Sequence, residues 1–328
     1  MRKRILIFVL AIFAITVSTS NVYPQKKLAQ TGFQFLSVGS DARASAMGEA
    51  FTTVEGLSSA LFYNPAGMAR LSSFVDMTAN HTQWIGDIKH YSFSLALSPW
   101  GGRNGVFGFS AMSVDYGEIQ GTMVWANPEG YIDTDIFKPQ AIAIGVGYAR
   151  CLTDKFSVGG QIKEVSQSLG KSVAPDEGVK KNLASALAFD FGTIYRTGFK
   201  SLSFGVSLRN FSEEVKFERE GFQLPLTFKI GLSVNALDFF MDVPREKHSL
   251  LLIMDAVHPR SYPEYIDLGS EYLFMNMLAL RLGYMTGQDE CGLTMGFGLQ
   301  KFGFSFDYSY TPFGVFNNVN RFTVRLSK

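Results

Sequence analysis

Side chains that commonly carry chemistry are few and scattered in this sequence. The histidines are His81, His90, His248 and His258, and the cysteines are Cys151 and Cys291. Neither set has the spacing of a metal site. The chain also lacks a Gly-x-Ser-x-Gly elbow, a phosphate loop and a recognisable Ser/His/Asp grouping. We therefore expect no bound metal, no cofactor and no enzymatic activity.

The segment 38–69 differs from the rest because it is rich in Ala, Gly and Ser and does not alternate. Asp41 is a good N-cap residue, and a helix is predicted over 42–52. The apolar face of this helix would consist of Ala46, Met47, Ala50 and Phe51. A second short helical turn, 57–62, must end before Pro65. Such small residues allow the segment to pack closely against, or inside, another part of the protein.

Polar side chains in this segment allow two interpretations. Arg43 and Glu49 could line a ligand path, or they could pair with charges elsewhere in the chain and hold the segment in place. Candidate partners are Asp190 and Lys229. Asn64 and Pro65 could gate a lumen, or they could cap and end a helix. Because an unpaired buried charge is costly, we expect Arg43 and Glu49 to have partners in either case.

From Phe74 onward the sequence alternates between two kinds of residue, which is the signature of β-strands. One phase is large and apolar. The other is small or polar, and it contains Lys163, Asp190, Arg209, Lys229, Arg281, Asp307 and Arg325. We expect about fourteen strands, near 74–84, 88–99, 105–116, 139–150, 156–168, 183–195, 201–210, 225–235, 248–257, 264–274, 278–285, 292–300, 302–311 and 320–327.

The composition narrows the class of protein. The chain has 328 residues and a formal net charge of +1, with only 18% charged residues, 32 Gly and 30 Phe. A charge near zero argues against binding to nucleic acid.

Residues 1–25 are typical of an export signal, with basic residues at 2–4, an apolar stretch at 5–17 and small residues after it. That apolar stretch is shorter than the ~20 residues of a spanning helix.

Alternation alone fits both a soluble β-sandwich and a membrane barrel. The export signal, the even strand count and the small residues of the second phase favour lipid outside and a narrow polar lumen inside. We therefore expect an all-β fold, a transmembrane outer-membrane β-barrel of about fourteen antiparallel strands at 73–328. A small, partly helical N-terminal plug at 26–72 would follow a cleaved signal peptide at 1–25. This places the protein in the bacterial outer membrane, in contact with its lipid.

The predicted connections mostly alternate between short and long, as periplasmic turns and outer loops do in such barrels. The even strand count places both ends of the barrel in the periplasm. Cys151 then falls in a periplasmic turn and Cys291 near an outer loop, about 25 Å apart. This separation exceeds the reach of a disulfide, so we expect two free thiols.

The predicted outer loop at 117–138 is unusually apolar. Its candidate partner-binding residues are Trp125, Tyr131, Ile136 and Phe137. A cluster of exposed apolar residues suggests a binding surface, and the alternative is packing over the barrel mouth. Trp84 and Trp100, near predicted strand ends, have an ordinary explanation as anchors at the membrane interface.

Two motifs resemble the N-terminal region of the PorV/PorQ family of outer-membrane proteins, which are related to the FadL transporters of hydrophobic compounds. The first is Asp41-Ala-Arg-Ala-Ser-Ala-Met-Gly-Glu-Ala50 and the second is Asn64-Pro-Ala-Gly67. The resemblance implies a 14-stranded barrel with an N-terminal plug. The plug motif would comprise Asp41, Arg43, Met47, Gly48, Glu49, Asn64, Pro65, Ala66 and Gly67.

The resemblance implies two different functions. PorV-like proteins serve the type IX secretion system, where they bind or shuttle secreted cargo bearing a C-terminal signal domain, or dock to translocon or attachment-complex subunits. FadL-like proteins pass fatty acids or aromatic hydrocarbons through a plugged lumen. The first motif favours the PorV-like role, and passive transport of hydrophobic small molecules is the alternative. A transporter needs a side opening or an apolar path past the plug, whereas a docking protein needs neither.

Overall fold

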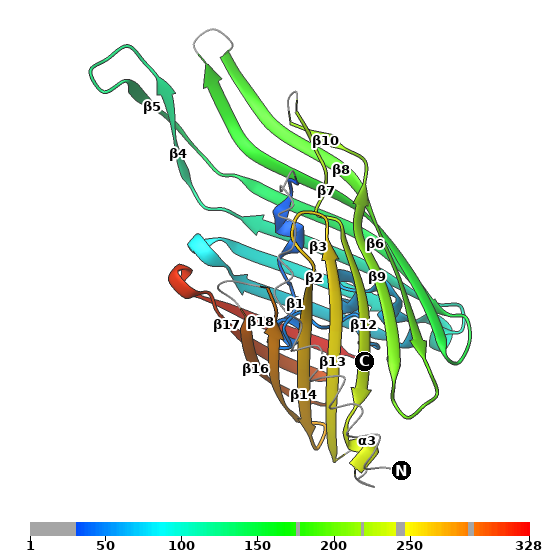
Figure 1. Cartoon of the computed structure of the whole chain (residues 1–328). Coiled ribbons are helices and arrows are strands. Elements are labelled where there is room, and N and C mark those ends of the chain that lie inside the picture. Colours follow the sequence, from blue (N-terminus) through cyan, green and yellow to red (C-terminus); the bar gives the residue numbers. More distant parts are fainter. Residues whose placement is uncertain (1–30, 175–177, 218–219, 241–246, 288–291) are drawn as a thin grey trace.

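The computed structural model of the chain shows strands that close around the N-terminal segment (Figure 1). It describes residues 31–174, 178–217, 220–240, 247–287 and 292–328. The expected signal peptide, residues 1–25, and Cys291 lie outside the described residues. Cys151, which lies within them, is a free thiol, as expected. No helix in the described part is long and apolar enough to cross a membrane.

Fourteen strands of the described chain form one closed antiparallel barrel. They are β1 (Val75–Gln83), β2 (Lys89–Leu97), β3 (Val106–Asp115), β6 (Gln140–Cys151), β7 (Phe156–Ala174), β8 (Gly178–Arg196), β9 (Ser203–Ser212), β12 (Thr227–Asn235), β13 (His248–Pro259), β14 (Tyr265–Phe274), β15 (Leu278–Met285), β16 (Leu293–Lys301), β17 (Phe304–Pro312) and β18 (Asn318–Ser327). Each strand pairs with the next, and β18 pairs with β1 to close the ring. The predicted fourteen-strand barrel is therefore confirmed, although β7 and β8 are longer than predicted.

The alternation of the sequence separates the two faces of the wall. On β6, Ile142, Ile144 and Val146 point outward and are about half exposed or more, whereas Ala141 and Ala143 point inward and are buried. The same pattern recurs around the ring, since successive side chains of a strand point to opposite faces. Large apolar residues therefore cover the outside, and small or polar ones line the lumen.

The short elements that connect the barrel strands lie at the two ends of the barrel. The first barrel strand begins and the last one ends at the same end of the barrel, where the backbone N–H of Val75 donates to the carbonyl of Lys328 at 2.9 Å. We call this the turn end, and it carries α3 (Leu237–Phe240) and the short helix η5 (Pro99–Gly102). The opposite, loop end carries η4 (Ile85–Asp87), η6 (Gly314–Phe316), the hairpin of β4 (Ile119–Val124) and β5 (Tyr131–Phe137), and the pair β10 (Val215–Lys216) and β11 (Gly221–Phe222).

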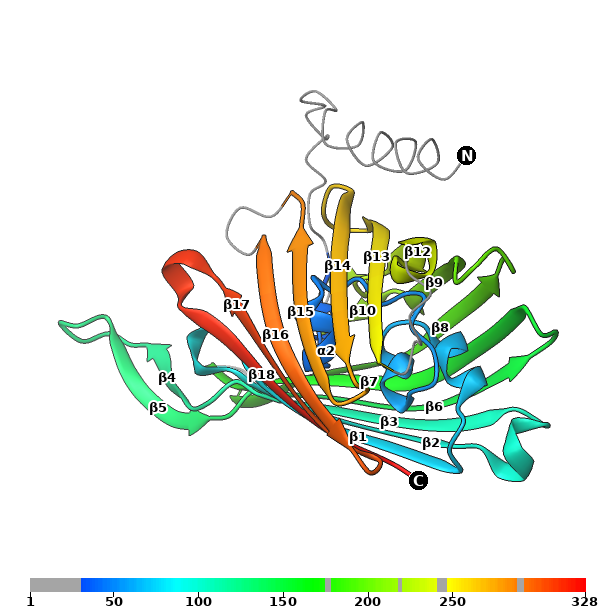
Figure 2. The ribbon, with the colours of Figure 1, turned by 90° about the horizontal axis from the view of Figure 1, so that it is seen from below.

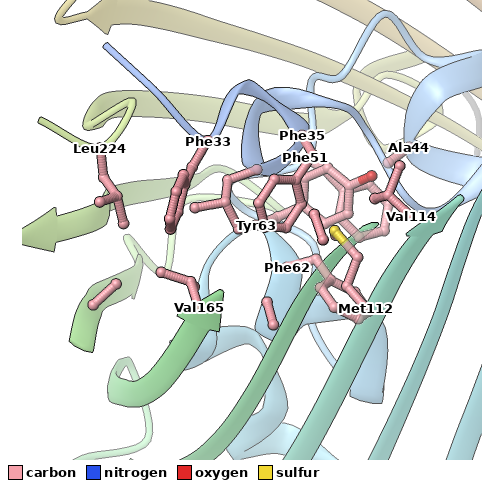
Figure 3. Close-up of a cluster of buried hydrophobic side chains, with 14 of the residues drawn as sticks. Phe33, Phe35, Ala44, Phe51, Phe62, Tyr63, Met112, Val114, Val165 and Leu224 are labelled. Carbon is pink, nitrogen blue, oxygen red and sulfur yellow. The ribbon is translucent and has the colours of Figure 1, made fainter. Parts of the chain in front are cut away.

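Residues 31–74, here called the plug, lie inside the ring of strands, as the view from below shows (Figure 2). The plug contains one short α-helix and three 3-10 helices. They are η1 (Gln34–Ser37), α2 (Ala42–Ala46), η2 (Ser58–Phe62) and η3 (Pro65–Arg70). Apolar side chains of the plug pack against the inner wall, where Phe33, Phe51 and Tyr63 lie near Val114 of β3 and Val165 of β7 (Figure 3).

The predicted helix over 42–52 is wrong in its length, because α2 ends at Ala46. Gly48 and Glu49 both have positive φ, at 64° and 63°, so the chain turns sharply after Met47. The backbone N–H of Gly48 donates to Thr294 Oγ1 on β16 at 3.0 Å. Local turn bonds follow, as from Glu49 N–H to the carbonyl of Ala44 at 3.0 Å, and the N–H groups of Phe51 and Thr52 donate to Asp255 of the wall. Tertiary contacts thus override helix propensity.

Glycines on the inner wall allow the plug to approach the strands closely. A Cβ added at Gly283 would lie 2.0 Å from the backbone nitrogen of Gly48, and one at Gly192 would lie 1.8 Å from the side-chain oxygen of Asn64. Glycines with an added Cβ under 3.0 Å from a plug atom are Gly108, Gly147, Gly159, Gly192, Gly205, Gly231, Gly269, Gly283 and Gly296. Glycine is the residue that permits such close backbone approach. The lumen has room for the plug because these positions lack side chains.

Adjacent glycines on β7 provide a test of this fit. A Cβ at Gly159 would lie 2.5 Å from the backbone nitrogen of Ala66, whereas one at Gly160 would approach nothing closer than 3.5 Å. Because overpacking destabilises a close-packed site, we expect Gly159→Ala to lower the free energy of unfolding by about 1–3 kcal/mol. Gly160→Ala should change it little. Urea unfolding in detergent micelles measures both, and equal effects would contradict the fit described here.

Candidate functional site

The plug motif begins with a helix cap and an ion-pair chain. Asp41 caps α2, its carboxylate accepting from the backbone N–H of Arg43 at 2.7 Å. The Arg43 guanidinium donates twice to Glu271 of β14, at 2.7 and 2.6 Å. Glu271 also accepts from Arg281 at 2.6 Å, and Arg281 donates to Asp307 at 2.7 Å. This chain of charges fixes α2 to β14, β15 and β17.

A second set of polar contacts fixes the turn that follows α2. Lys229 Nζ donates to the backbone carbonyl of Glu49 at 2.9 Å and to Asp267 at 2.8 Å. The Asp255 carboxylate accepts from the backbone N–H groups of Phe51 and Thr52, at 2.9 and 3.0 Å. Charged groups of the plug and the wall thus have partners, as expected, but the partners are not all the expected ones.

The expected partners are only partly correct. Arg43 pairs with Glu271, and Asp190 pairs instead with Lys163 at 2.7 Å. Lys229 does contact Glu49, but through the backbone carbonyl. The Glu49 carboxylate accepts from Ser45 Oγ at 2.5 Å.

The second motif is a capping element. Asn64 caps η3, its side-chain oxygen accepting from the backbone N–H of Ala66 at 3.1 Å, and Pro65 occupies the first position of that helix. The Asn64 amide also donates to the carbonyls of Thr52 and Thr193. The carbonyl of Gly67 accepts from the N–H of Gly56 at 2.7 Å. All four motif residues are buried, and they do not line the cavities described next.

A pocket of about 530 Å³ lies in the lumen on the loop-end side of the plug, and we call it the loop-end pocket. Its aromatic lining consists of Phe35, Phe62, Tyr63, Trp84, Tyr116, Tyr262, Tyr265 and Phe313. Its charged lining consists of Glu49, Arg209, Lys229 and Arg321. A mainly apolar cavity of this size with a few polar groups has the character of a small-molecule site.

A smaller cavity of about 360 Å³ lies toward the turn end, and we call it the turn-end chamber. It is lined mainly by charged and hydroxyl side chains, including Arg43, Glu55 and Arg325. The two cavities meet at α2, because Asp41 and Arg43 line the chamber while Ser45 lines the loop-end pocket. The lumen is therefore apolar on one side of α2 and polar on the other.

An apolar recess of about 470 Å³ lies on the wall between β12 and β16, lined by Leu252, Leu282 and Tyr284 among others. The plug lies directly behind it, since Gly269 and Gly283 border the recess and also approach Met47 and Gly48. The strands β14 and β15 pair without interruption from Asp267 to Phe274. Backbone hydrogen bonds therefore close the wall between this recess and the lumen.

The predicted outer loop forms the β4–β5 hairpin, which projects away from the barrel in both views (Figures 1 and 2). Trp125, Tyr131 and Ile136 are about half exposed. Phe137 differs, because a Cβ on Gly170 of β7 would lie 2.4 Å from its ring. Phe137 thus anchors the base of the hairpin, and the other three side chains face solvent rather than the barrel mouth.

The sequence did not predict the loop-end pocket. Trp84, expected as an interface anchor, instead lines the pocket, with the Arg321 guanidinium 5.5 Å from its ring centre. Its pocket neighbours come from connections and strand ends far apart in the sequence, such as Tyr262 and Phe313. Only the closure of the barrel brings them together, and no local pattern marks them. The part of the chain that the structure describes holds no cluster of His, Cys, Asp and Glu suited to a metal ion.

Comparison of sequences finds no matching family model and no matching curated protein. Comparison of structures finds the toluene transporter TbuX of Ralstonia pickettii at a TM-score of 0.60 and 12% identity, covering 88% of this chain and 98% of that one. The toluene transporter TodX of Pseudomonas putida follows at 0.55 and 11%, with 92% and 98% covered. A FadL homologue of Pseudomonas aeruginosa has 0.53 and 12%, with 88% and 99% covered. At these identities the similarity establishes a shared, FadL-like barrel fold, and it does not confirm the PorV/PorQ resemblance.

The ion-pair chain predicts unequal effects of removing its members. Glu271 holds two guanidinium groups, so Glu271→Gln should lower the free energy of unfolding by about 3–5 kcal/mol, the usual cost of stranding a buried charge. Arg43→Met should cost less, because Glu271 keeps Arg281 as a partner. Urea unfolding of each purified variant measures the difference.

The matched control is Glu118→Gln, which breaks the exposed pair with Lys138 at 2.6 Å. Exposed pairs contribute about 0–1 kcal/mol, so this variant should unfold almost as the original chain does. A larger loss for Arg43→Met than for Glu271→Gln would contradict the central place of Glu271.

Proposed function

We propose that the protein is an outer-membrane barrel that takes up a small, largely apolar molecule through its loop-end pocket. The observation that carries this proposal is the pocket itself, which is about 530 Å³ in volume and lined by aromatic side chains from both plug and wall. Toluene transporters and a FadL homologue share the fold, and this supports the same class of cargo. No part of the proposal requires catalysis.

Features of the outer surface support a place in the outer membrane. Large apolar residues cover the outside of the wall, as on β6. At the turn end, Trp100, Phe199 and Phe302 occupy three separate connections between strands and are 75%, 55% and 88% exposed. Aromatic residues at the rim of an apolar band are typical of barrels that sit in a bilayer. The export signal expected at residues 1–25 agrees with this location.

Passage through the barrel would require the plug to change its position. Two plug helices border both cavities: α2 through Arg43 and Ser45, and η2 through Ser59 and Phe62. Of these, α2 is only five residues long. Its hydrogen bonds to the wall lie close together, from Ala42 to Gly48. Displacement of α2 would join the loop-end pocket to the turn-end chamber.

One observation favours a second candidate, the PorV-like role in type IX secretion. The β4–β5 hairpin projects from the barrel and exposes Val124, Trp125 and Ile136, which are 82%, 49% and 58% accessible. Single exposed apolar residues are ordinary on a protein surface, whereas a cluster of them suggests a binding surface. This role requires a protein partner, which is either secreted cargo with a C-terminal signal domain or a translocon or attachment-complex subunit.

Two serine positions test the pocket. Ser37 of η1 is exposed into the loop-end pocket, and Ser72 is exposed into the turn-end chamber. Since Ser37→Trp would fill the pocket, we expect it to weaken binding of octanol at least about tenfold, equivalent to ~1.4 kcal/mol. Ser72→Trp should leave binding unchanged. Equilibrium dialysis of the full-length protein in nanodiscs, corrected for empty nanodiscs, measures both affinities.

Absence of octanol binding to the unmodified protein would contradict the proposed uptake function. Equal losses in both variants would place the binding site elsewhere in the lumen.

The hairpin is tested by replacing Val124, Trp125 and Ile136 with Ser together, leaving the packed Phe137 intact. If the second candidate is correct, surface and culture-fluid proteomics should show selective loss of exported proteins that share a C-terminal domain, because the exposed contact area is gone. An unchanged set of exported proteins, with the barrel still present in the membrane, would count against docking through this hairpin.

A further inference from the structure

Ser270 interrupts the row of large side chains on the outer face of β14. The other outward side chains of this strand are large, and they are Ile266, Leu268, Tyr272 and Phe274. In the register of the sheet, Ser270 faces Leu252 on β13 and Leu282 on β15. These two leucines are 40% and 57% exposed. A hollow therefore lies between them, and it belongs to the apolar recess between β12 and β16.

The recess is suited to hydrocarbon rather than to water or a charged group. The hydroxyl of Ser270 is satisfied within the wall, because its Oγ donates to the carbonyl of Leu282 at 3.2 Å. An unsatisfied polar group would be costly at this position, since the bilayer core has no water to bond it. Within the residues that the structure describes, no charged side chain lines the recess.

The recess is elongated, because it follows a row of cross-strand neighbours over five strands. This row consists of Leu232 on β12, Met254 on β13, Leu268 on β14, Tyr284 on β15 and Leu293 on β16. Since neighbouring strands lie about 4.8 Å apart, the row is ~19 Å long. A volume of about 470 Å³ along this length suits an extended, flexible chain better than a compact ring.

The floor of the recess is a single layer of backbone. Gly269 and Gly283 face each other across β14 and β15, and on the lumen side they closely approach the plug at Met47 and Gly48. A hollow on the other side of this layer deprives the wall of packing contacts. An occupant of the recess would restore those contacts where the wall meets the plug.

The membrane limits what the occupant can be. Water is absent from the bilayer core, whereas acyl chains surround the wall on all sides. Recognition of an anionic head group ordinarily uses a basic pocket, and the described lining of the recess offers no cation. The surroundings and the lining therefore both point to a hydrocarbon chain.

We propose that the recess binds one acyl chain of a membrane phospholipid and recognises the chain rather than the head group. The bound chain fills the hollow at Ser270 and lies along the row from Leu232 to Leu293. This lipid lies on the outer wall and is distinct from any cargo of the lumen, so the inference goes beyond the proposed uptake function. It rests on the place of the barrel in the outer membrane.

Native mass spectrometry of the full-length protein provides the test. Protein stripped of lipid in detergent is offered equal amounts of phosphatidylethanolamine and phosphatidylglycerol with identical chains. We expect one lipid per barrel, drawn equally from the two. Ser270→Leu should weaken binding at least about tenfold, because the leucine displaces two or more buried methylene groups that each contribute about fourfold. Ser270→Ala, which keeps the hollow, should retain the lipid.

The matched control is Thr193→Leu, which places the same new residue on the outward face of β8, away from the recess. It should retain the lipid. Ser37→Trp, which fills the loop-end pocket, should retain it as well, and this separates the lipid from the cargo of the lumen. Heat-modifiable migration on gels confirms that each variant is a folded barrel.

Three results would overturn the inference and leave the proposed uptake function intact. The first is that the unmodified protein binds no lipid, or that Ser270→Leu binds it undiminished. The second is a strong preference for phosphatidylglycerol, which would mean that the head group is recognised. The third is a dimer that Ser270→Leu abolishes, which would assign the recess to a second copy of the chain.

Discussion

The close approach of the plug to the inner wall is the constraint on which the rest of the structure depends. A barrel of fourteen strands is wider than the eight-stranded barrels whose interiors side chains alone can fill. Here glycines from β3 round to β16 leave that space to the plug. The backbone at Met47 and Gly48 lies directly on the strands, and the Asn64 side chain occupies the place of a side chain at position 192. Close packing of this kind tolerates little change in volume.

The charges of the lumen follow from the same arrangement. Once the plug excludes water from the wall, every charged group nearby needs a partner. Glu271, Asp255 and Lys229 meet this need by binding plug atoms, and they hold the plug as they do so. Polar anchors gather around α2 and leave the loop-end side of the lumen mainly apolar. The separation of a polar chamber from an apolar pocket is thus a result of where the plug is anchored.

Much of the barrel could be predicted from the sequence, because alternation is a local pattern with a direct structural meaning. The alternation correctly predicted that Arg209, Lys229 and Arg281 face the lumen. A shift of one residue would have moved every side chain of a strand to its opposite face. The length of α2 was not predictable, because Thr294 and Asp255, which compete with the helix, lie more than 200 residues away in the chain.

The candidate site was harder to predict for the same reason. Arg43 was expected to have a partner, but which acid it meets depends on the order of strands around the ring. Asn64 and Pro65 behave as local capping rules suggest. Trp84 follows no such rule, since its place in the pocket depends on the closure of β1 on β18. The protruding hairpin was marked by its composition, whereas its direction away from the barrel mouth was not.

Fluorescence of Trp84 alone would test the central claim, that the loop-end pocket receives an apolar molecule, most directly. Trp84 lines the pocket, while Trp100 lies at the turn end and Trp125 on the hairpin. In a variant with Trp100 and Trp125 replaced by Phe, bromooctane should quench Trp84 saturably. The corresponding variant that retains only Trp100 should show weak quenching that does not saturate. Equal quenching of the two tryptophans would contradict the account, because it would mean that the probe enters the bilayer but not the pocket.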